Sequence, residues 1–260
     1  KSGGVDTALF AVDSSTGALT FSTAPDYDSG SACDAGNSCV VILTATSGSL
    51  TDTITVTVAI TDINDNTPIF TDGDTASASV AEGATTVATY AATDADGSSA
   101  HNTVTYSKSG GVDTALFAVD SSTGALTFST APDYDSGTAC DAGNSCVVEL
   151  TASDGTLSDT ITVTVAITDA NDQTPTYSGG DVTPSVAEGT TAVDSFTVVD
   201  TDSGDVNTCA LGGADAGSFA CAVSGDSISI AFSTAPDYET PGSVAGTNVY
   251  AMTATISDGT

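Results

Sequence analysis

Short acidic motifs recur along the chain, and their residue types point to metal binding. They are an Asp-x-acid pair after a proline (Asp26/Asp28, Asp133/Asp135, Asp237/Glu239), a second Asp-x-Asp pair (Asp94/Asp96, Asp200/Asp202), a Val-Ala-Glu-Gly phrase (Glu82, Glu188) and two linker phrases that end in Thr-Pro (residues 62–68 and 169–175). Carboxylate and amide oxygens are the hard ligands that Ca²⁺ prefers, and it takes about six to eight of them. Because the motifs stand at matching places in successive parts of the chain, we expect calcium sites rather than scattered surface charge.

The same residues offer weaker grounds for catalysis. Paired carboxylates can serve as the acid and base of a glycosidase, but here the pairs are too many, too regular and too close to the linkers. A Ser-His-Asp triad would need His101, the one histidine of the sequence, which is better explained as a loop residue. The glycine pairs at 3–4 and 110–111 lack the Lys-Ser/Thr that completes a phosphate-binding loop. We therefore expect no enzyme.

The charge balance narrows the possible partners. The 260 residues contain 34 acidic side chains, two lysines and no arginine, which gives a formal charge of −32. Lys1 and Lys108 cannot neutralise a nucleic-acid backbone, and an anionic membrane surface would repel the chain. No apolar run approaches the roughly 20 residues that span a bilayer, and no basic leader precedes one, so we expect a mature, soluble chain without membrane contact. Adaptation to high salt explains part of the excess charge but not the repeated placement of the acids.

Six cysteines stand in three close pairs, Cys33/Cys39, Cys140/Cys146 and Cys209/Cys221. An even count at repeated spacing predicts three disulfides and an oxidising, extracellular compartment. The alternative of buried, reduced thiols fits poorly with the polar Cys-Asp-Ala-Gly-Asn-Ser-Cys surroundings of the first two pairs. Zinc is disfavoured because histidine, its usual ligand beside cysteine, occurs once.

The chain repeats itself with a period of 107 residues. Residues 1–68 match residues 108–175 with eight differences: Ser31/Thr138, Ile42/Glu149, Thr46/Ser153, Ser47/Asp154, Ser49/Thr156, Thr51/Ser158, Ile63/Ala170 and Asn66/Gln173. A third, diverged copy is visible in the phrases at 232–239 and 257–260. A unit of this length is a domain rather than a solenoid repeat, so we divide the chain into copy one (1–68), copy two (69–175) and copy three (176–260). Copy one then lacks its first strands and copy three its last, which predicts either a window on a longer tandem array or a subunit that exchanges strands with its neighbours.

The local pattern is β throughout. In residues 54–60 and 161–167, isoleucine and valine alternate with threonine or alanine, as on a strand with one buried and one solvent-exposed face. Further strands are predicted at 18–22, 39–45, 86–91, 103–106, 195–199 and 227–231, with turn formers between them. No amphipathic helix of useful length is visible. Several short strands in roughly 100 residues predict, for each copy, an antiparallel Greek-key sandwich of about seven strands.

Taken together, the ordered motifs resemble the cadherin extracellular repeat. The matching features are the Glu of Val-Ala-Glu-Gly, the Asp-x-acid pair, the Asp-x-Asn-Asp linker, the Asp-x-Asp pair, a late Asp and the phrase Phe-Ala-Val-Asp-Ser-Ser-Thr-Gly-Ala-Leu at 117–126. Such motifs, in order over essentially all of the chain, form a specific signal, whereas one Asp-x-Asp alone would be weak. The resemblance implies an all-β fold of tandem, immunoglobulin-like, seven-stranded sandwiches joined by short calcium-binding linkers, with about three Ca²⁺ ions at each junction.

The resemblance also implies a ligand set at each junction. Between copies one and two the set is Asp26, Asp28, Asp62, Asn64, Asp65, Asp94, Asp96, Asn102 and Asp154. Between copies two and three it is Glu82, Asp133, Asp135, Asp169, Asn171, Asp172, Asp200, Asp202, Asn207 and Asp258. Without metal, the carboxylates of each set would repel one another and the linker would become a hinge. Ser47 stands where copies two and three have Asp154 and Asp258, so any site ahead of copy one would be incomplete.

The function that these features predict is structural or adhesive. We expect an extracellular or cell-surface array that Ca²⁺ stiffens, serving as an adhesin, a stalk or a filament subunit. Its expected partners are further copies of itself or other extracellular proteins. Strand-swapping vertebrate members of the family use a tryptophan for adhesion, and this sequence has none, so self-association would use another surface. One alternative is that the array is the non-catalytic spacer of a larger secreted enzyme. A carbohydrate-binding module is disfavoured because no aromatic residues cluster in the sequence.

Overall fold

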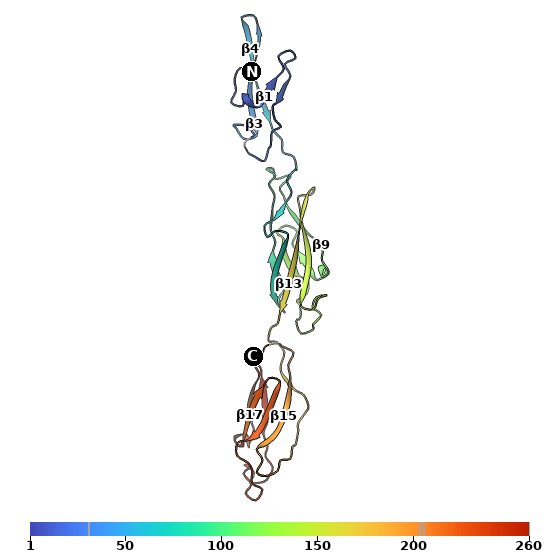
Figure 1. Ribbon diagram of the computed structural model, residues 1–260, viewed down its shortest axis with the longest axis vertical. Helices are drawn as coiled ribbons and strands as arrows, with labels where there is room; N and C mark the ends of the chain where they lie inside the picture. Colours follow the sequence, from blue (N-terminus) through green and yellow to red (C-terminus); the bar gives the residue numbers. More distant parts are fainter. Residues whose placement is uncertain (31, 203, 205, 260) are drawn as a thin grey trace. The chain divides into compact units, whose positions relative to one another are not determined.

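The computed structural model describes residues 1–30, 32–202, 204 and 206–259. The chain divides into two compact units. The first comprises Lys1–Val80, Ala84–Ala131 and Cys140–Ala166, and the second comprises Ala81–Gly83, Pro132–Ala139 and Ile167–Thr260. The regular elements of both units are strands and three-residue 3-10 turns (Figure 1). Across the described residues, no helix has the length and apolar character needed to cross a membrane.

Copy two forms a sandwich of seven strands in two sheets (Figure 1). One sheet has the order β6-β13-β12-β9, with bounds Thr75–Ala81, Ser158–Thr168, Ser145–Ser153 and Thr105–Gly110. The other has the order β10-β11-β7, with bounds Phe117–Val119, Ala125–Phe128 and Thr86–Thr89. A short pair of β5 (Ile69–Phe70) with β8 (Ala92–Thr93) and the turn η2 (Thr114–Leu116) complete the copy. The predicted all-β sandwich is therefore confirmed.

The core of copy two follows from the alternation of its residues. On β12 and β13 every second side chain is buried, and Leu150, Ile161 and Val163 are fully so. Across the β10-β11 pair, the rings of Phe117 and Phe128 lie 4.5 Å apart. Each buried side chain of this size contributes about 1.5–3 kcal/mol to the free energy of folding. A shift of one residue in strand pairing would move all of these buried side chains to the solvent-exposed face, so the alternating pattern fixes the register.

Copy one contains fewer strands. They are β1 (Phe10–Val12), β2 (Leu19–Phe21), β3 (Ser38–Ser47) and β4 (Leu50–Ala59), after the turn η1 (Thr7–Leu9). β1 pairs with β2 and β3 pairs with β4, and the core holds Phe10, Val41 and the Cys33–Cys39 disulfide. β4 matches β13 in sequence, yet Ile54 of β4 is 61% exposed. β4 has one neighbouring strand where β13 has two.

Copy three has a four-stranded and a two-stranded sheet. The first has the order β14-β15-β18-β17, with bounds Thr176–Tyr177, Ala192–Val199, Ser227–Phe232 and Phe219–Ser224. The second pairs β16 (Thr208–Gly212) with β19 (Thr253–Ser257), and the turn η3 (Ala216–Ser218) precedes β17. Val198, Ile228 and Ile230 form the buried core.

Most of the strands that the sequence predicts lie where they are expected. The predictions at 18–22, 39–45, 54–60, 86–91, 161–167, 195–199 and 227–231 overlap β2, β3, β4, β7, β13, β15 and β18. The prediction at 103–106 is displaced, because β9 pairs with β12 as far as Gly110. More than half of the observed strands were not predicted. One of them is β6, whose small residues lack a branched run and whose strand is set by its neighbour β13. All three predicted disulfides are present.

Candidate metal centre

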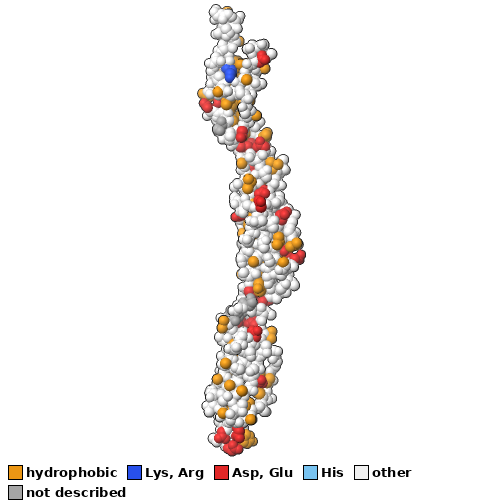
Figure 2. Space-filling view, viewed as in Figure 1, with side chains coloured by type: hydrophobic (Ala, Val, Ile, Leu, Met, Phe, Trp, Pro, Cys, Tyr) orange, Lys and Arg blue, Asp and Glu red, His pale blue; other side chains and the backbone are white. Residues whose placement is uncertain are grey.

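The predicted ligands gather in two acidic sites. The first acidic site comprises Asp28, Asp62, Asn64, Asp94, Asp96 and Asp154, with Asn66 between its carboxylates. The second comprises Glu82, Asp135, Asp169, Asp172 and Asp202. On the face drawn in Figure 2, Asp and Glu side chains likewise form discrete patches instead of an even coat. The acids that the sequence places far apart are therefore concentrated where the linkers run.

Two overlapping groups of carboxylates build the first acidic site. Asp28, which follows β2, Asp62, which follows β4, and Asp96, which follows β8, each offer an oxygen within 4.8 Å of the other two. Asp94, Asp96 and Asp154 form a second group at the same spacing, with Asp154 in the turn between β12 and β13. Asp96 belongs to both groups and is 2% exposed. Shared carboxylates of this kind can bridge adjacent cations.

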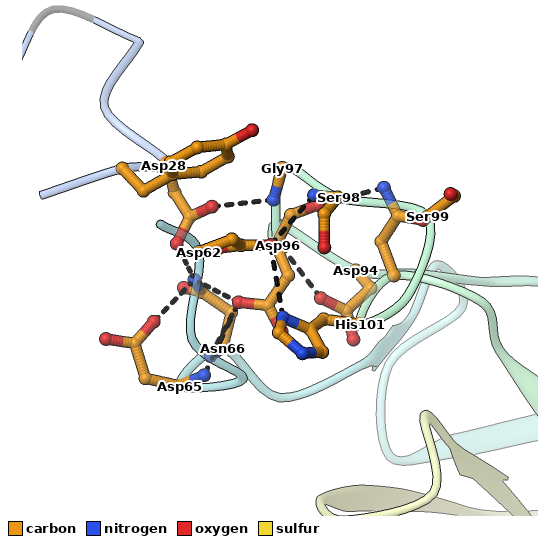
Figure 3. Close-up of polar contacts among 12 residues, drawn as sticks. Asp28, Asp62, Asp65, Asn66, Asp94, Asp96, Gly97, Ser98, Ser99 and His101 are labelled. Carbon is orange, nitrogen blue, oxygen red and sulfur yellow. Dashed lines mark hydrogen bonds and ion pairs between the residues drawn. The ribbon is translucent and has the colours of Figure 1, made fainter. Parts of the chain in front are cut away.

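Backbone and amide donors hold these carboxylates in place (Figure 3). The Asn66 Nδ2 donates to Asp28 Oδ2 at 2.9 Å, to Asp96 Oδ1 at 2.9 Å and to Asp65 Oδ1 at 3.2 Å. The N–H of Gly97 donates to Asp28 Oδ1 at 2.6 Å. A Cβ at Gly97 would lie 2.7 Å from the ring of Tyr27, so this close approach requires glycine.

Two further residues contact Asp62. The N–H of Ser98 donates to Asp62 Oδ2 at 2.9 Å, and His101 Nδ1 lies 3.2 Å from the same oxygen. The Ser98 hydroxyl, followed by the Ser98 N–H and His101, lowers the pKa of Asp62 despite its burial. Asp62 therefore stays ionised.

The second acidic site is organised by a buried glutamate. Glu82, 8% exposed, accepts the N–H of Tyr134 at 2.7 Å on one oxygen and the N–H of Ala170 at 2.8 Å on the other. Its carboxylate lies with those of Asp135 and Asp169 in one group.

Asp135 links this group to a second one. It lies with Asp172 and Asp202 in a group whose oxygens are within 4.8 Å of one another. Burial, followed by the charges of Asp202, Glu82 and Asp169, raises the pKa of Asp135 to about 6. Burial and the neighbouring carboxylates thus make Asp135 bind a proton more tightly than an ordinary aspartate does.

Many ligand oxygens in these sites are buried without a hydrogen-bond donor. Among the described residues they include Asp62 Oδ1, Asn64 Oδ1, Asp94 Oδ2, Asp96 Oδ2 and Asp154 Oδ2 in the first site, and both oxygens of Asp135 with Asp200 Oδ2, Asp202 Oδ1 and Asn207 Oδ1 in or beside the second. Leaving a buried polar atom without a partner costs free energy, and such atoms in native proteins are usually satisfied by water or an ion. Their position at the predicted ligands points to cation binding.

The chemistry of the ligand atoms determines which type of cation fits the sites. Both sites offer carboxylate and amide oxygens, and every cysteine of the chain is in a disulfide. Hard oxygen ligands suit Ca²⁺, whereas structural zinc sites use cysteine and histidine. The residues present therefore fit a hard divalent ion.

The remaining predicted ligands are placed less centrally. Asp26 and Asp133 accept N–H groups of their own turns, from Ser29 and Ser136. Asn102 donates to the carbonyl of Asp96, and Asp65 accepts from Asn66. The carboxylate of Asp258 is buried but lies outside the groups described above, and Asn171 stands in the linker beside Asp172.

Several residues at the sites were not among the predicted ligands. Asn66, Ser98 and His101 lie in the first site, and Gln173 donates to Asp172 in the second. The signal for Asn66 and Gln173 is their place at the end of the linker motif, where copies one and two differ. A further carboxylate group, Glu188, Asp237 and Glu239, occupies the motif positions of Glu82, Asp133 and Asp135 and is exposed.

Comparisons with known proteins relate the chain to the cadherin domain. The family model for the cadherin domain matches residues 76–168. Over 163 residues the chain is 35% identical to human Protocadherin Fat 1, and over 162 residues it is 34% identical to mouse Cadherin EGF LAG seven-pass G-type receptor 2. The aligned part is 60% of this chain in both cases, but only 3% and 5% of those much longer relatives.

Solved structures show the same fold. The crystal structure of the Protocadherin GammaB4 extracellular domain aligns over 89% of this chain and 36% of its own, with a TM-score of 0.63 and 26% identity. The crystal structure of human CDH23 EC21-23 aligns over 95% of this chain and 80% of its own, with a TM-score of 0.69 and 23% identity.

Proposed function

This chain carries the cadherin extracellular repeat, and on that premise we propose that its two acidic sites bind Ca²⁺ and that the bound ions stiffen the linkers at 62–68 and 169–175. Like its cadherin-domain relatives, the protein is extracellular or at the cell surface, and it is of the adhesion type. The observation that carries the calcium proposal is the set of buried ligand oxygens that no donor satisfies.

The ligand sets are those that the resemblance implies. At the first site they are Asp26, Asp28, Asp62, Asn64, Asp65, Asp94, Asp96, Asn102 and Asp154, and at the second Glu82, Asp133, Asp135, Asp169, Asn171, Asp172, Asp200, Asp202, Asn207 and Asp258. The second set contains eight carboxylates, so about three Ca²⁺ ions would offset most of their charge. The ions supply positive charge and coordination, while the chain supplies oxygens from segments on both sides of each linker.

The mechanical consequence follows from electrostatics. Without a cation, carboxylates within 4.8 Å of one another repel across each linker. With cations, the same oxygens become shared ligands, and the linker loses freedom because several segments are bound to one ion. We propose that this rigidity lets tandem copies, with boundaries at 1–68, 69–175 and 176–260, act as a stalk, an adhesin or a filament subunit without catalysis.

The partners that we propose are other extracellular or cell-surface proteins, including further copies of the same chain. The Protocadherin gammaB7 EC3-6 structure, which aligns with a TM-score of 0.67, is described as a cis-dimer. That description concerns the neighbour.

Calcium titration of the chelator-treated chain tests the proposal. Saturating Ca²⁺, at about 100 times its dissociation constant, should stabilise the fold by about 2.7 kcal/mol and raise the melting temperature by about 5–10 °C. Hydrogen exchange at the linkers should slow at the same time. Mg²⁺ serves as the matched cation, and it should act far more weakly because it demands a tighter octahedral geometry. Unchanged melting and exchange with Ca²⁺ would refute the proposal.

A pair of variants assigns the effect to the ligands. Asp169→Asn should lower the calcium stoichiometry of the second site while the sandwiches stay folded. Asp194→Asn is the control, because Asp194 lies on β15 and accepts the N–H of Ser195 rather than joining either site. Full stoichiometry in Asp169→Asn would show that the ligand assignment is wrong.

A further inference from the structure

An asparagine outside the acidic sites contacts the turn that carries the Asp-x-acid pair. In copy one, Asn37 Nδ2 donates to the carbonyl of Tyr27, the middle residue of that turn, at 3.0 Å. In copy three, Asn248 Nδ2 donates to the carbonyl of Tyr238, the middle residue of the corresponding turn, at 2.9 Å. The contact thus recurs in two copies, although the residues between the tyrosine and the asparagine differ.

The tyrosine backbone is held at both of its polar groups. In copy three, the carbonyl of Tyr238 accepts from Asn248, and its N–H donates to Glu188 Oε2 at 3.0 Å. In copy two, the N–H of Tyr134 likewise donates to Glu82 at 2.7 Å. Glu82 is in the ligand set that the family resemblance implies, whereas the asparagine is in neither set. The asparagine is therefore a separate support of the turn.

The turn in copy one has its own short-range hydrogen bonds. Residues 26–30 include one from the N–H of Asp28 to Asp26 Oδ1 at 3.0 Å. Such bonds fix the shape of the turn but not its place in the copy, because donor and acceptor both belong to the turn. The Asn37 side chain reaches the Tyr27 carbonyl from another loop, so its bond fixes where the turn lies.

The main chain of Asn37 contacts a second segment that carries a predicted ligand. Its carbonyl accepts the N–H of Ile60 at 2.9 Å, and Ile60 stands two residues before Asp62. Asn37 thus joins the turn that contains Asp28 to the start of the linker at 62–68. Asp28 and Asp62 belong to one carboxylate group of the first acidic site (Figure 3). The spacing of these two acids therefore depends on the place of Asn37.

The loop that carries Asn37 is itself constrained. The Cys33–Cys39 disulfide closes it. The carboxylate of Asp6, which is 3% exposed, accepts N–H groups from the two ends of the loop at 2.7 Å each. A side chain on a constrained loop loses little freedom when it forms a hydrogen bond, so Asn37 is already in place to hold the turn.

We propose that Asn37 is a positioning residue of the first acidic site, which keeps Asp28 and Asp62 at the spacing that a bound Ca²⁺ requires. The inference rests on the proposed function and extends it to a residue that acts through the turn and the linker. Residues that orient metal ligands affect metal affinity although they do not bind the metal themselves. Loss of Asn37 should therefore weaken calcium binding without removing a ligand.

Hydrogen exchange of the full, metal-free chain tests the contact independently of calcium. In excess chelator, Asn37→Ala should speed the exchange of the amides in residues 26–30 about fivefold, because a hydrogen bond to the turn is lost. Asn144→Ala is the matched control, because Asn144 is the equivalent residue of copy two, and it should leave this turn unchanged. Equal exchange of the turn in the wild type and in Asn37→Ala would overturn the proposal.

A conservative variant separates hydrogen-bond donation from packing. In Asn37→Asp, a carboxylate has no hydrogen for the Tyr27 carbonyl, whereas a protonated carboxyl group has an O–H that can donate to it. At neutral pH, residues 26–30 should therefore exchange at least as fast as in Asn37→Ala. At about pH 3.5 the rate should return toward that of the wild type at the same pH. If Asn37→Asp matches Asn37→Ala at both pH values, the proposal is wrong.

Calcium titration then separates positioning from a purely structural contact. Asn37→Ala should bind calcium about tenfold more weakly at the first site with unchanged stoichiometry, and Asn144→Ala should leave the first site unaltered. Unchanged affinity in Asn37→Ala would overturn the proposal, because the contact would then serve the turn alone. A wild type that binds no calcium would refute the proposed function and with it the role of Asn37 toward calcium, whereas the exchange comparison would still report the contact.

Discussion

The two acidic sites use the same motif positions but differ in how the chain itself offsets their charge. In the first site, the amide of Asn66 donates to the carboxylates of Asp28, Asp65 and Asp96. In the second, the longer side chain of Gln173 donates to Asp172 at 2.7 Å, and its backbone N–H donates to Asp202 at 2.8 Å. One added methylene therefore moves the donor away from the centre of the carboxylate cluster.

The two sites also differ in the pKa of the carboxylate at one equivalent position, Asp28 in the first site and Asp135 in the second. Burial and the charges of Asp62, Asp96 and Asp65 raise the pKa of Asp28, but the N–H of Gly97 opposes this. Neither oxygen of Asp135, the counterpart of Asp28, has a donor, and its pKa rises to about 6. We conclude that the amide of Asn66 offsets part of the negative charge of the first site, whereas more of the negative charge of the second site is left without a hydrogen-bond donor.

The largest effect should come from removal of a central ligand. Asp96→Asn removes a carboxylate that two groups of the first site share, and Asp202→Asn removes one from a single group of the second. We expect Asp96→Asn to weaken calcium binding at the first site on the order of 100-fold, about 2.8 kcal/mol. Asp202→Asn should have a smaller effect at the second site. Calorimetric titration of each variant measures both.

Each of these variants is the other's control. Because the ligand sets share no residue, the site that is not mutated should keep its affinity. Loss of affinity at both sites in one variant would mean that the sites are coupled, and the comparison would then fail.

A smaller effect should follow from removal of the amides. In excess chelator, Asn66→Ala should destabilise the linker at 62–68 by about 1–2 kcal/mol, because several hydrogen bonds to carboxylates are lost. Gln173→Ala should destabilise the linker at 169–175 by less than half of that, because its side chain reaches one carboxylate. Hydrogen exchange of the two linkers measures the difference. If both linkers respond equally, the amide of Asn66 does not have the role that we infer.

Much of the fold was accessible from the sequence because its signals are local. Alternation along residues 161–167 predicts a strand with one buried face, and the closely spaced cysteines predict disulfides. The repeated acidic motifs predict metal sites, since a motif repeated in domain-length units occupies the same place in each unit, and their resemblance to the cadherin repeat implies which residues belong to each site. These predictions required no knowledge of the distances between segments.

What the sequence could not give depends on contacts between distant segments. The role of Asn66 requires residues 28 and 96 to lie beside it, and no spacing rule predicts that. Copy three similarly replaces the Cys140–Cys146 disulfide of copy two: Tyr250 stands at the position of Cys146 and packs edge-on against the rings of Phe219 and Phe232. An aromatic cluster there is a property of packing, which only the folded chain displays.

The smallest effect that we predict is a difference between the two sites in how calcium affinity depends on pH. Because the pKa of Asp135 is raised in the folded, metal-free chain, that state binds a proton more tightly than the unfolded chain does. The contribution of Asp135 to stability therefore falls as the pH rises from about 4 to about 6, and acidification relieves the repulsion from Asp202, Glu82 and Asp169. With Ca²⁺ present the sign reverses, because a proton on Asp135 competes with the cation.

Acidification from neutral pH to about 5.5 should thus weaken calcium binding a few-fold at the second site and less at the first, where Asn66 and Gly97 donate to Asp28. Parallel calcium titrations at the two pH values measure this, and Asp135→Asn provides the control, since its second site should bind calcium weakly but with little pH dependence. If acidification lowers the calcium affinity of both wild-type sites equally, Asn66 does not substitute for a cation. An equal loss would also mean that the carboxylates of the two sites face the same electrostatic environment.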